Sequence, residues 1–162
     1  MAMTPAEYFA SFVEGNFEDC LSNPGCVRRA FNASVAASHL ADHYFTFNAR
    51  HHPSLVFAFP TIGPFVEHID KGTGGAFRDI RSIANAYKHL YTDVSSQYAA
   101  HSTVSSAGSI DSIQLADDSD LEMVSEEYVE DRYTVVFTRK DGTRHEFLPA
   151  LERVVDFWRE SL

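Results

Sequence analysis

The chain has 162 residues, of which 44% are hydrophobic and 13% aromatic, a composition typical of a folded domain and not of a disordered segment. It contains no run approaching the roughly 18 consecutive apolar residues of a spanning helix, and its first residues, MAMTPAEYFASF, lack the basic and then apolar pattern of a secretory signal. The formal net charge is −10, but residues 111–131 carry nine of the 23 acidic residues and no lysine or arginine, so we expect this segment to be a solvated acidic loop. From the chain length we expect a single domain over 1–162, and we expect it to be cytoplasmic.

The first half of the chain predicts helices. The capping-box sequence TPAE, with proline at the first helical position, predicts a helix over residues 5–21. The breaker SNPG ends it, and an Ala- and Phe-rich segment predicts a second helix at about 27–47. Prolines and glycines dominate residues 48–74, which predicts an irregular connection with a short helical turn at 65–69.

The second half combines helix and strand signals. A third helix is predicted at about 75–92, and it completes a helical part over residues 1–95. A small β part with the acidic loop is predicted over 108–148, because SIDSIQL alternates and two β-rich runs flank the hairpin dipeptide Asp-Gly. The apolar face of 149–162 predicts a C-terminal helix that packs back on the bundle. The expected fold is mainly α: a bundle of about four helices with an antiparallel hairpin or meander inserted before the last helix.

The third predicted helix has a polar arc opposite its apolar face. At about 100° per residue, the arc collects Arg78, Arg81, Asn85, Lys88 and His89. An amphipathic helix needs a polar outer face, and basic residues late in a helix suit its dipole. However, asparagine is a poor helix former, and arginine, lysine, asparagine and histidine together suit phosphate binding. Both interpretations stay open.

The second predicted helix carries His39 and His43, spaced so that both imidazoles can reach one metal ion. His89 of the third helix is a candidate third ligand, and Asp42 is a candidate ligand or supporting partner. All three histidines are weak metal candidates, since no further ligand follows from the spacing; hydrogen-bonded or surface histidines, or a non-metal polar site between the helices, are the alternatives. We expect no cofactor.

The glycine-rich segment KGTGGAF, residues 71–77, leads into the third helix. Such a loop can cradle an anion at a helix N-terminus. It lacks the preceding strand and the following Lys-Ser/Thr of a phosphate-binding loop, so a helix cap is the preferred interpretation.

Four segments together, SHLADHYF, RDIRSIANAYKH, DGT and VVDFWRESL, resemble a widespread group of short uncharacterised bacterial proteins. That group has a helix of the type D-x-x-N-x-x-K-H and a closing Phe-Trp helix. The matching residues here are Asp79, Asn85, Lys88 and His89, with Asn85 one turn further along. More distantly, the chain resembles HEPN domains, helical bundles that often dimerise. Many of these cleave RNA without metal, using an Arg and a His on one helix that have four to six residues between them.

Three functions follow as hypotheses. In the first, a polar site between the second and third helices binds a phosphate-bearing small molecule or RNA; if it cleaves RNA, His89 acts as general acid or base and Arg81 stabilises the developing charge. Asn85, Lys88, Arg78, His39 and His43 would bind the ligand. In the second, the chain is a non-enzymatic protein that forms a homodimer and whose polar network fixes helix register. In the third, the bundle binds a metal or small molecule. No membrane partner is expected.

Overall fold

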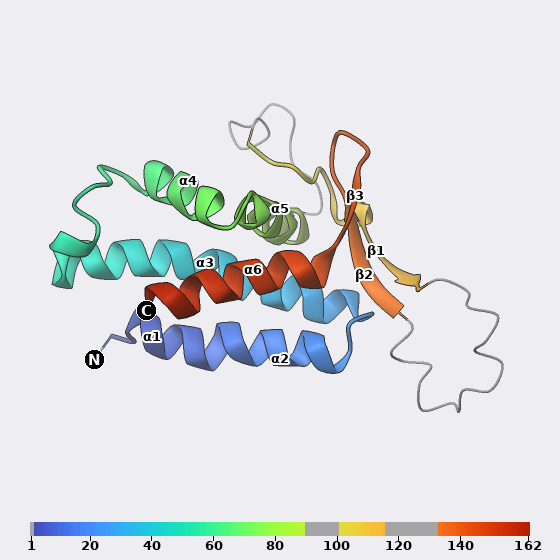
Figure 1. The fold of residues 1–162 in the computed structure, drawn as a ribbon, viewed down its shortest axis with the longest axis horizontal. Coiled ribbons are helices and arrows are strands. Elements are labelled where there is room, and N and C mark those ends of the chain that lie inside the picture. The colour runs from blue at the N-terminus through green and yellow to red at the C-terminus, as the bar shows by residue number, and fades with distance from the viewer. Residues whose placement is uncertain (1, 90–100, 116–132) are drawn as a thin grey trace.

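The computed structural model describes residues 2–89, 101–115 and 133–162, with only the backbone of His89. Its helices form an elongated bundle, and a small sheet lies at one end (Figure 1). The helices are α1 (Pro5–Tyr8), α2 (Gly15–Ser22), α3 (Val27–His51), α4 (Ile62–Gly72), α5 (Ala76–His89) and α6 (Phe147–Ser161). The strands are β1 (Ile110–Gln114), β2 (Tyr133–Thr138) and β3 (Arg144–Glu146). The predicted fold class, a mainly helical bundle with an antiparallel meander before the last helix, is confirmed.

The first helix begins at the predicted capping box. The backbone N–H of Glu7 donates to Thr4 Oγ1 at 3.2 Å, and that of Thr4 donates to Glu7 Oε2 at 2.8 Å. These two bonds satisfy amide groups that a helix start leaves without intrahelical partners. A π-helical segment, Phe9–Glu14, joins α1 to α2 without a break. The chain is therefore helical from Pro5 to Ser22, as the sequence predicts.

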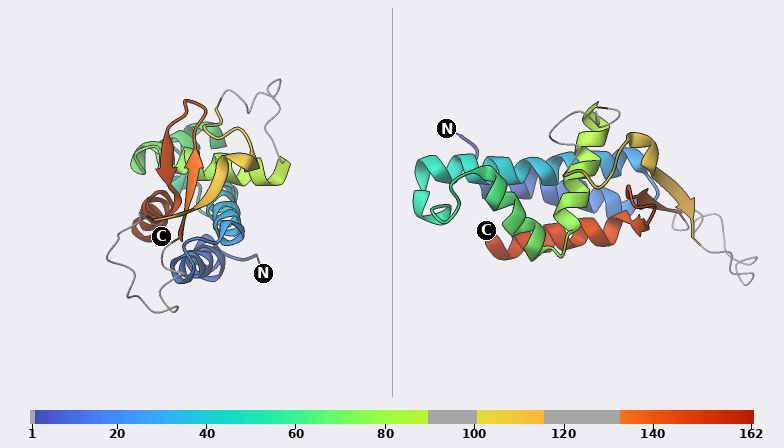
Figure 2. Two further views of the ribbon diagram at one scale, coloured as in Figure 1. Left: turned by 90° about the vertical axis from the view of Figure 1, so that its right-hand side faces the viewer. Right: turned by 90° about the horizontal axis from the view of Figure 1, so that it is seen from above.

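Helix α3 occupies the middle of the bundle and contacts α1, α2, α4, α5 and α6. The small side chains of its alanine-rich face allow neighbouring helices to approach closely, and Ala37, Leu40 and Ala41 on this helix are fully buried. Helix α5 does not run alongside α3 but crosses it steeply (Figure 2). A crossing helix touches its neighbour over a short stretch, so polar arcs along the two helices do not face each other over their whole length.

The sheet has the order β1-β2-β3 and is antiparallel throughout. The β2–β3 hairpin turns at the predicted Asp-Gly pair, where Gly142 has φ of 83°, a conformation that favours glycine. Val135 and Phe137 of β2 join the core, which also contains Phe77 of α5 and Trp158 of α6. Residues from every part of the bundle and from the sheet thus share one core.

Two predicted boundaries were wrong. The segment expected to be an irregular connection contains α4, which is longer than the turn predicted at 65–69 because Pro64 lies within its first turn, where proline is tolerated. Helix α3 continues past 47 to His51. The end of the third helix beyond 89 and most of the acidic run lie outside the described residues. Within the described ranges, no helix has the length and apolar character needed to cross a bilayer.

Candidate functional site

The polar arc predicted on α5 faces carboxylates on two neighbouring helices. Arg81 Nη1 donates to Asp42 Oδ2 of α3 at 3.1 Å, and Nη2 lies 3.4 Å from Asp42 Oδ1. Arg78 turns instead toward α4, where its Nε lies 3.6 Å from Asp70 Oδ2. Each arginine of the arc therefore already has an anionic partner within the protein.

The other residues of the arc have no such contacts. Asn85 is half-buried and Lys88 is exposed. No hydrogen bond or ion pair joins either side chain to another residue within the described ranges. His89 is the last residue of α5, and its side chain lies outside the described part of the structure. The catalytic pair predicted from the sequence, Arg81 with His89, is therefore described only at Arg81.

His43 of α3 contacts the N-terminal segment of the chain. His43 Nε2 lies 2.9 Å from the carbonyl oxygen of Met3, to which it donates, and the His43 ring lies 5.4 Å from that of Tyr8. His39 is exposed. The structure therefore brings His43 to the N-terminal segment and Arg81 to Asp42. Among the described residues, no three His, Cys, Asp or Glu side chains are grouped as a metal site requires.

The glycine-rich segment before α5 is a helix cap. Thr73 Oγ1 accepts from the Phe77 N–H at 3.0 Å, and Asp70 Oδ1 accepts from the Arg78 N–H at 2.8 Å. Gly74 and Gly75 take φ of 61° and 89°, which allows the sharp entry into the helix. The first amides of α5 thus have partners within the chain, and the preferred interpretation of this segment as a cap is confirmed.

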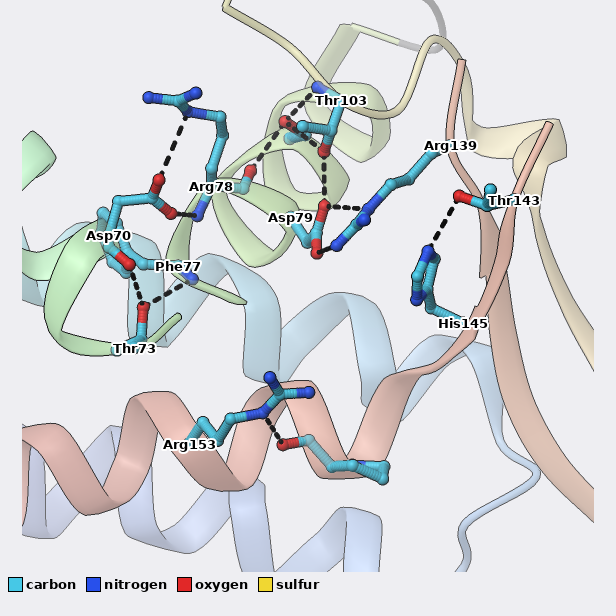
Figure 3. A network of polar contacts seen from close by, with 12 residues as sticks. Asp70, Thr73, Phe77, Arg78, Asp79, Thr103, Arg139, Thr143, His145 and Arg153 are labelled. Carbon is cyan, nitrogen blue, oxygen red and sulfur yellow. Dashed lines mark hydrogen bonds and ion pairs between the residues drawn. The ribbon is translucent and has the colours of Figure 1, made fainter. Parts of the chain in front are cut away.

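A pocket of about 270 Å³ lies where the start of α5, the β2–β3 hairpin and the start of α6 meet. Figure 3 shows part of this lining: Asp79 of α5, Arg139 and His145 of the hairpin, and Arg153 of α6. Six ionisable residues line it: Asp79, Arg139, Arg144, His145, Glu146 and Arg153. This is a concentration of basic groups in a chain whose formal net charge is −10.

One ion pair fixes the back of this pocket. Arg139, which directly follows β2, donates from Nε to Asp79 Oδ1 at 3.0 Å and from Nη2 to Asp79 Oδ2 at 2.6 Å. Thr103 Oγ1 adds a third donor to Asp79 at 2.7 Å. The Asp79 side chain is only 3% exposed, and its hydrogen bonds raise the pKa of Arg139 above the ordinary value. The pair therefore holds the hairpin against α5, and because the two charges neutralise each other, neither group has much charge to offer a ligand.

Two other arginines of the pocket have no carboxylate partner within the described ranges. Arg144 lies on β3 and is exposed. Arg153 lies on α6, where its Nε donates to the carbonyl oxygen of Pro149 at 3.3 Å, which leaves its terminal nitrogens without a partner among the described residues. Glu146 is the one acid of the described lining that is not engaged by Arg139. The charged lining residues outside the Asp79–Arg139 pair therefore carry a net positive charge.

Sequence reasoning did not find this pocket. It gave Asp79 no contact and His145 no role, because the partner of Asp79 lies 60 residues away in the β2–β3 hairpin. The available signal was the hairpin sequence TRKDGTRHE, in which basic residues flank the turn on both sides.

Comparisons with protein-family models, with curated proteins and with solved structures found no match to this chain. The resemblances to a bacterial protein group and to HEPN domains stay predictions.

Proposed function

We propose that this protein binds a small phosphate-bearing ligand in the pocket between α5, the β2–β3 hairpin and α6. The observation that carries the proposal is that Arg144 and Arg153, from different elements, both line one pocket and that neither has a carboxylate partner among the described residues. Guanidinium groups suit phosphate because they keep their charge and offer several donors in a fixed plane.

The pocket is suited to a ligand headgroup. Its volume of about 270 Å³ is close to the lower end of the range typical of small-molecule sites. The Asp79–Arg139 pair forms a fixed wall, since it is held by three hydrogen bonds. Such preorganisation lowers the entropy lost on binding. The proposed ligand class, a phosphate-bearing molecule, is the one expected from the sequence, but the proposed site lies at a different position in the fold.

Contacts at the originally expected site favour a structural role. Arg81 pairs with Asp42 and thereby links α5 to α3. A polar contact between helices is one part of the second hypothesis, a non-enzymatic homodimer whose polar network fixes helix register; the homodimer stays a prediction. Ribonuclease-like cleavage through Arg81 and His89 gains no support from these contacts, because the Arg81 guanidinium is directed at Asp42.

The test compares two double variants that remove the same charge. Inorganic phosphate and phenyl phosphate are titrated into the full chain, and binding is followed by calorimetry. Arg144→Gln with Arg153→Gln is expected to weaken binding by on the order of tenfold or more, since each arginine contributes charge-assisted hydrogen bonds. Arg78→Gln with Arg81→Gln is the matched control and is expected to leave affinity within about twofold, because these arginines lie outside the pocket. Equal losses in both variants would contradict the proposed location, and no binding by the wild type would contradict the function.

A further inference from the structure

The connection between α3 and α4 forms the end of the bundle opposite the sheet (Figure 1). Residues 52–60 of this connection are called the tip loop below. Among the described residues, Phe57 has the most exposed large apolar side chain, at 88%, and Leu55 follows at 57%. Exposed apolar side chains scattered singly need no explanation, whereas those gathered on one part of a surface mark an interaction site.

The exposure of these two side chains follows from an ordered backbone. The amides of Leu55, Val56 and Phe59 donate hydrogen bonds of between 2.9 and 3.2 Å to carbonyl oxygens within the tip loop. Val56 is buried, and the Phe59 ring packs on that of Phe65 with centroids 5.2 Å apart. Because Val56 and Phe59 anchor the loop to the bundle, its remaining large apolar side chains, Leu55 and Phe57, lie on the outside.

The charge of this end of the molecule differs from that of the rest. Residues 43–66 contain none of the 23 acidic residues and carry a formal charge of +1, from Arg50. With the total of −10, the rest of the chain therefore carries −11. Arg50, His51 and His52 are exposed next to the tip loop, and Arg50 has no hydrogen bond or ion pair within the described ranges. Such donors, with no acid beside them in the chain, suit phosphate groups.

We propose that the tip loop docks on the surface of a phospholipid bilayer that contains anionic lipids. Leu55 and Phe57 insert among the lipid chains, and Arg50 lies at the headgroup phosphates. Apolar side chains beside cationic and polar ones match the two layers of a membrane surface. A bilayer accepts a protruding apolar loop without a matching groove, whereas a protein partner needs a complementary shape.

This proposal revises the expectation that the chain has no membrane partner. It concerns docking on a bilayer and not crossing it, for which no helix of the described ranges is suited. It is independent of the proposed function, because the phosphate pocket lies at the sheet end of the molecule (Figure 1).

The test is sedimentation of the full chain with vesicles of phosphatidylcholine and phosphatidylserine. Leu55→Ser with Phe57→Ser is expected to weaken vesicle binding by on the order of tenfold or more, since both apolar groups are lost. Phe12→Ser with Leu21→Ser is the matched control, because it removes the same two residue types at positions that are 43% and 54% exposed. This control is expected to bind within about twofold of the wild type.

A single substitution tests the contribution of charge. Arg50→Gln is expected to weaken binding to the phosphatidylserine-containing vesicles by about fivefold, the effect of one cationic side chain at an anionic surface. Binding to pure phosphatidylcholine vesicles should stay within about twofold. Equal losses on both vesicles would contradict the role of anionic lipids.

Fluorescence locates the inserted residues. Trp158 is the one tryptophan of the chain and is fully buried, so a second tryptophan reports its own surroundings. We expect lipids that carry a nitroxide on the acyl chain to quench the added fluorescence of Phe57→Trp and not that of Phe12→Trp. Quenching of Phe12→Trp alone would place the membrane contact elsewhere and overturn the proposal.

Four further outcomes would also overturn it. The wild type does not sediment with either kind of vesicle, or the tip-loop and control variants lose binding equally. Binding is lost in Arg144→Gln with Arg153→Gln but kept in the tip-loop variant, which would assign the vesicles to the phosphate pocket. A homodimer forms without vesicles and dissociates in the tip-loop variant, which would make this end a protein contact. Phosphate binding in the pocket is measured separately, so failure of the membrane proposal leaves the proposed function standing.

Discussion

Two arginine–aspartate pairs on α5 differ in burial and therefore in what they do. Asp79, in the pair with Arg139, is 3% exposed and receives three hydrogen bonds. Asp42, in the pair with Arg81, is 47% exposed and has two longer contacts from that arginine. A buried carboxylate that loses its partner is strongly destabilising, whereas an exposed pair contributes little. The same chemistry thus fixes the hairpin at one place and adds a weak helix contact at the other.

This difference also indicates where binding is to be sought. Arginines that already neutralise an aspartate have less charge to offer a ligand. Arg144 and Arg153 lie beside the buried pair and have no carboxylate partner among the described residues. The buried pair supplies a fixed wall, and these two arginines supply the charge.

The largest effect is expected when the buried pair is broken. Arg139→Met leaves the Asp79 carboxylate buried with Thr103 as its remaining described donor. We expect the free energy of unfolding at neutral pH to fall by about 3 kcal/mol, measured by urea denaturation. A loss below about 1 kcal/mol would show that the pair does not hold the hairpin to the bundle.

Removing the two pocket arginines should affect binding and not stability. Arg144→Gln with Arg153→Gln should lower phosphate affinity by on the order of tenfold or more. Because both side chains are exposed, the unfolding free energy should stay within about 0.5 kcal/mol of the wild type. A variant that loses stability as strongly as Arg139→Met would mark these arginines as structural.

A smaller effect is expected at the exposed pair. Arg81→Met, the matched control for Arg139→Met, should cost about 0–1 kcal/mol, because Arg81 and Asp42 are 29% and 47% exposed. A double-mutant cycle with Asp42→Asn isolates the pair itself. A coupling energy above about 2 kcal/mol would remove the contrast on which the comparison depends.

The smallest effect concerns the hairpin turn. Hydrogen bonds from Thr143 lower the pKa of Asp141, so Thr143→Ala should return it toward its ordinary value. A carboxyl with a lowered folded pKa adds stability above its unfolded pKa, and this stability is lost as the pH falls through the folded pKa. Wild type and variant should therefore become more alike in stability below about pH 4. Titration of the Asp141 carboxyl by NMR measures the shift, and an unchanged pKa in the variant would contradict it.

Features encoded locally could be predicted from the sequence. The capping box at Thr4, the Asp-Gly turn and the apolar face of α6 each depend on residues close together in the chain. Helix α4 was underestimated because its glycines and Pro64 lower helix propensity, while burial of Phe65 and Ile69 stabilises it.

The candidate pocket could not be predicted in this way. Asp79 meets Arg139 across 60 residues, and Arg153 reaches the same pocket from α6. This arrangement depends on how the hairpin packs on the helices. Likewise, the steep crossing of α5 over α3 (Figure 2) depends on tertiary packing that a helical wheel does not show.

The most direct test of the account is a chemical-shift map of the full chain titrated with inorganic phosphate. We expect the shifted amides to cluster at the start of α5, at Arg139–Glu146 and at the start of α6, and the amides around Asp42 and His43 to stay in place. Shifts concentrated along α3 and the second half of α5, with the hairpin unchanged, would contradict the account and return the site to the position first expected from the sequence.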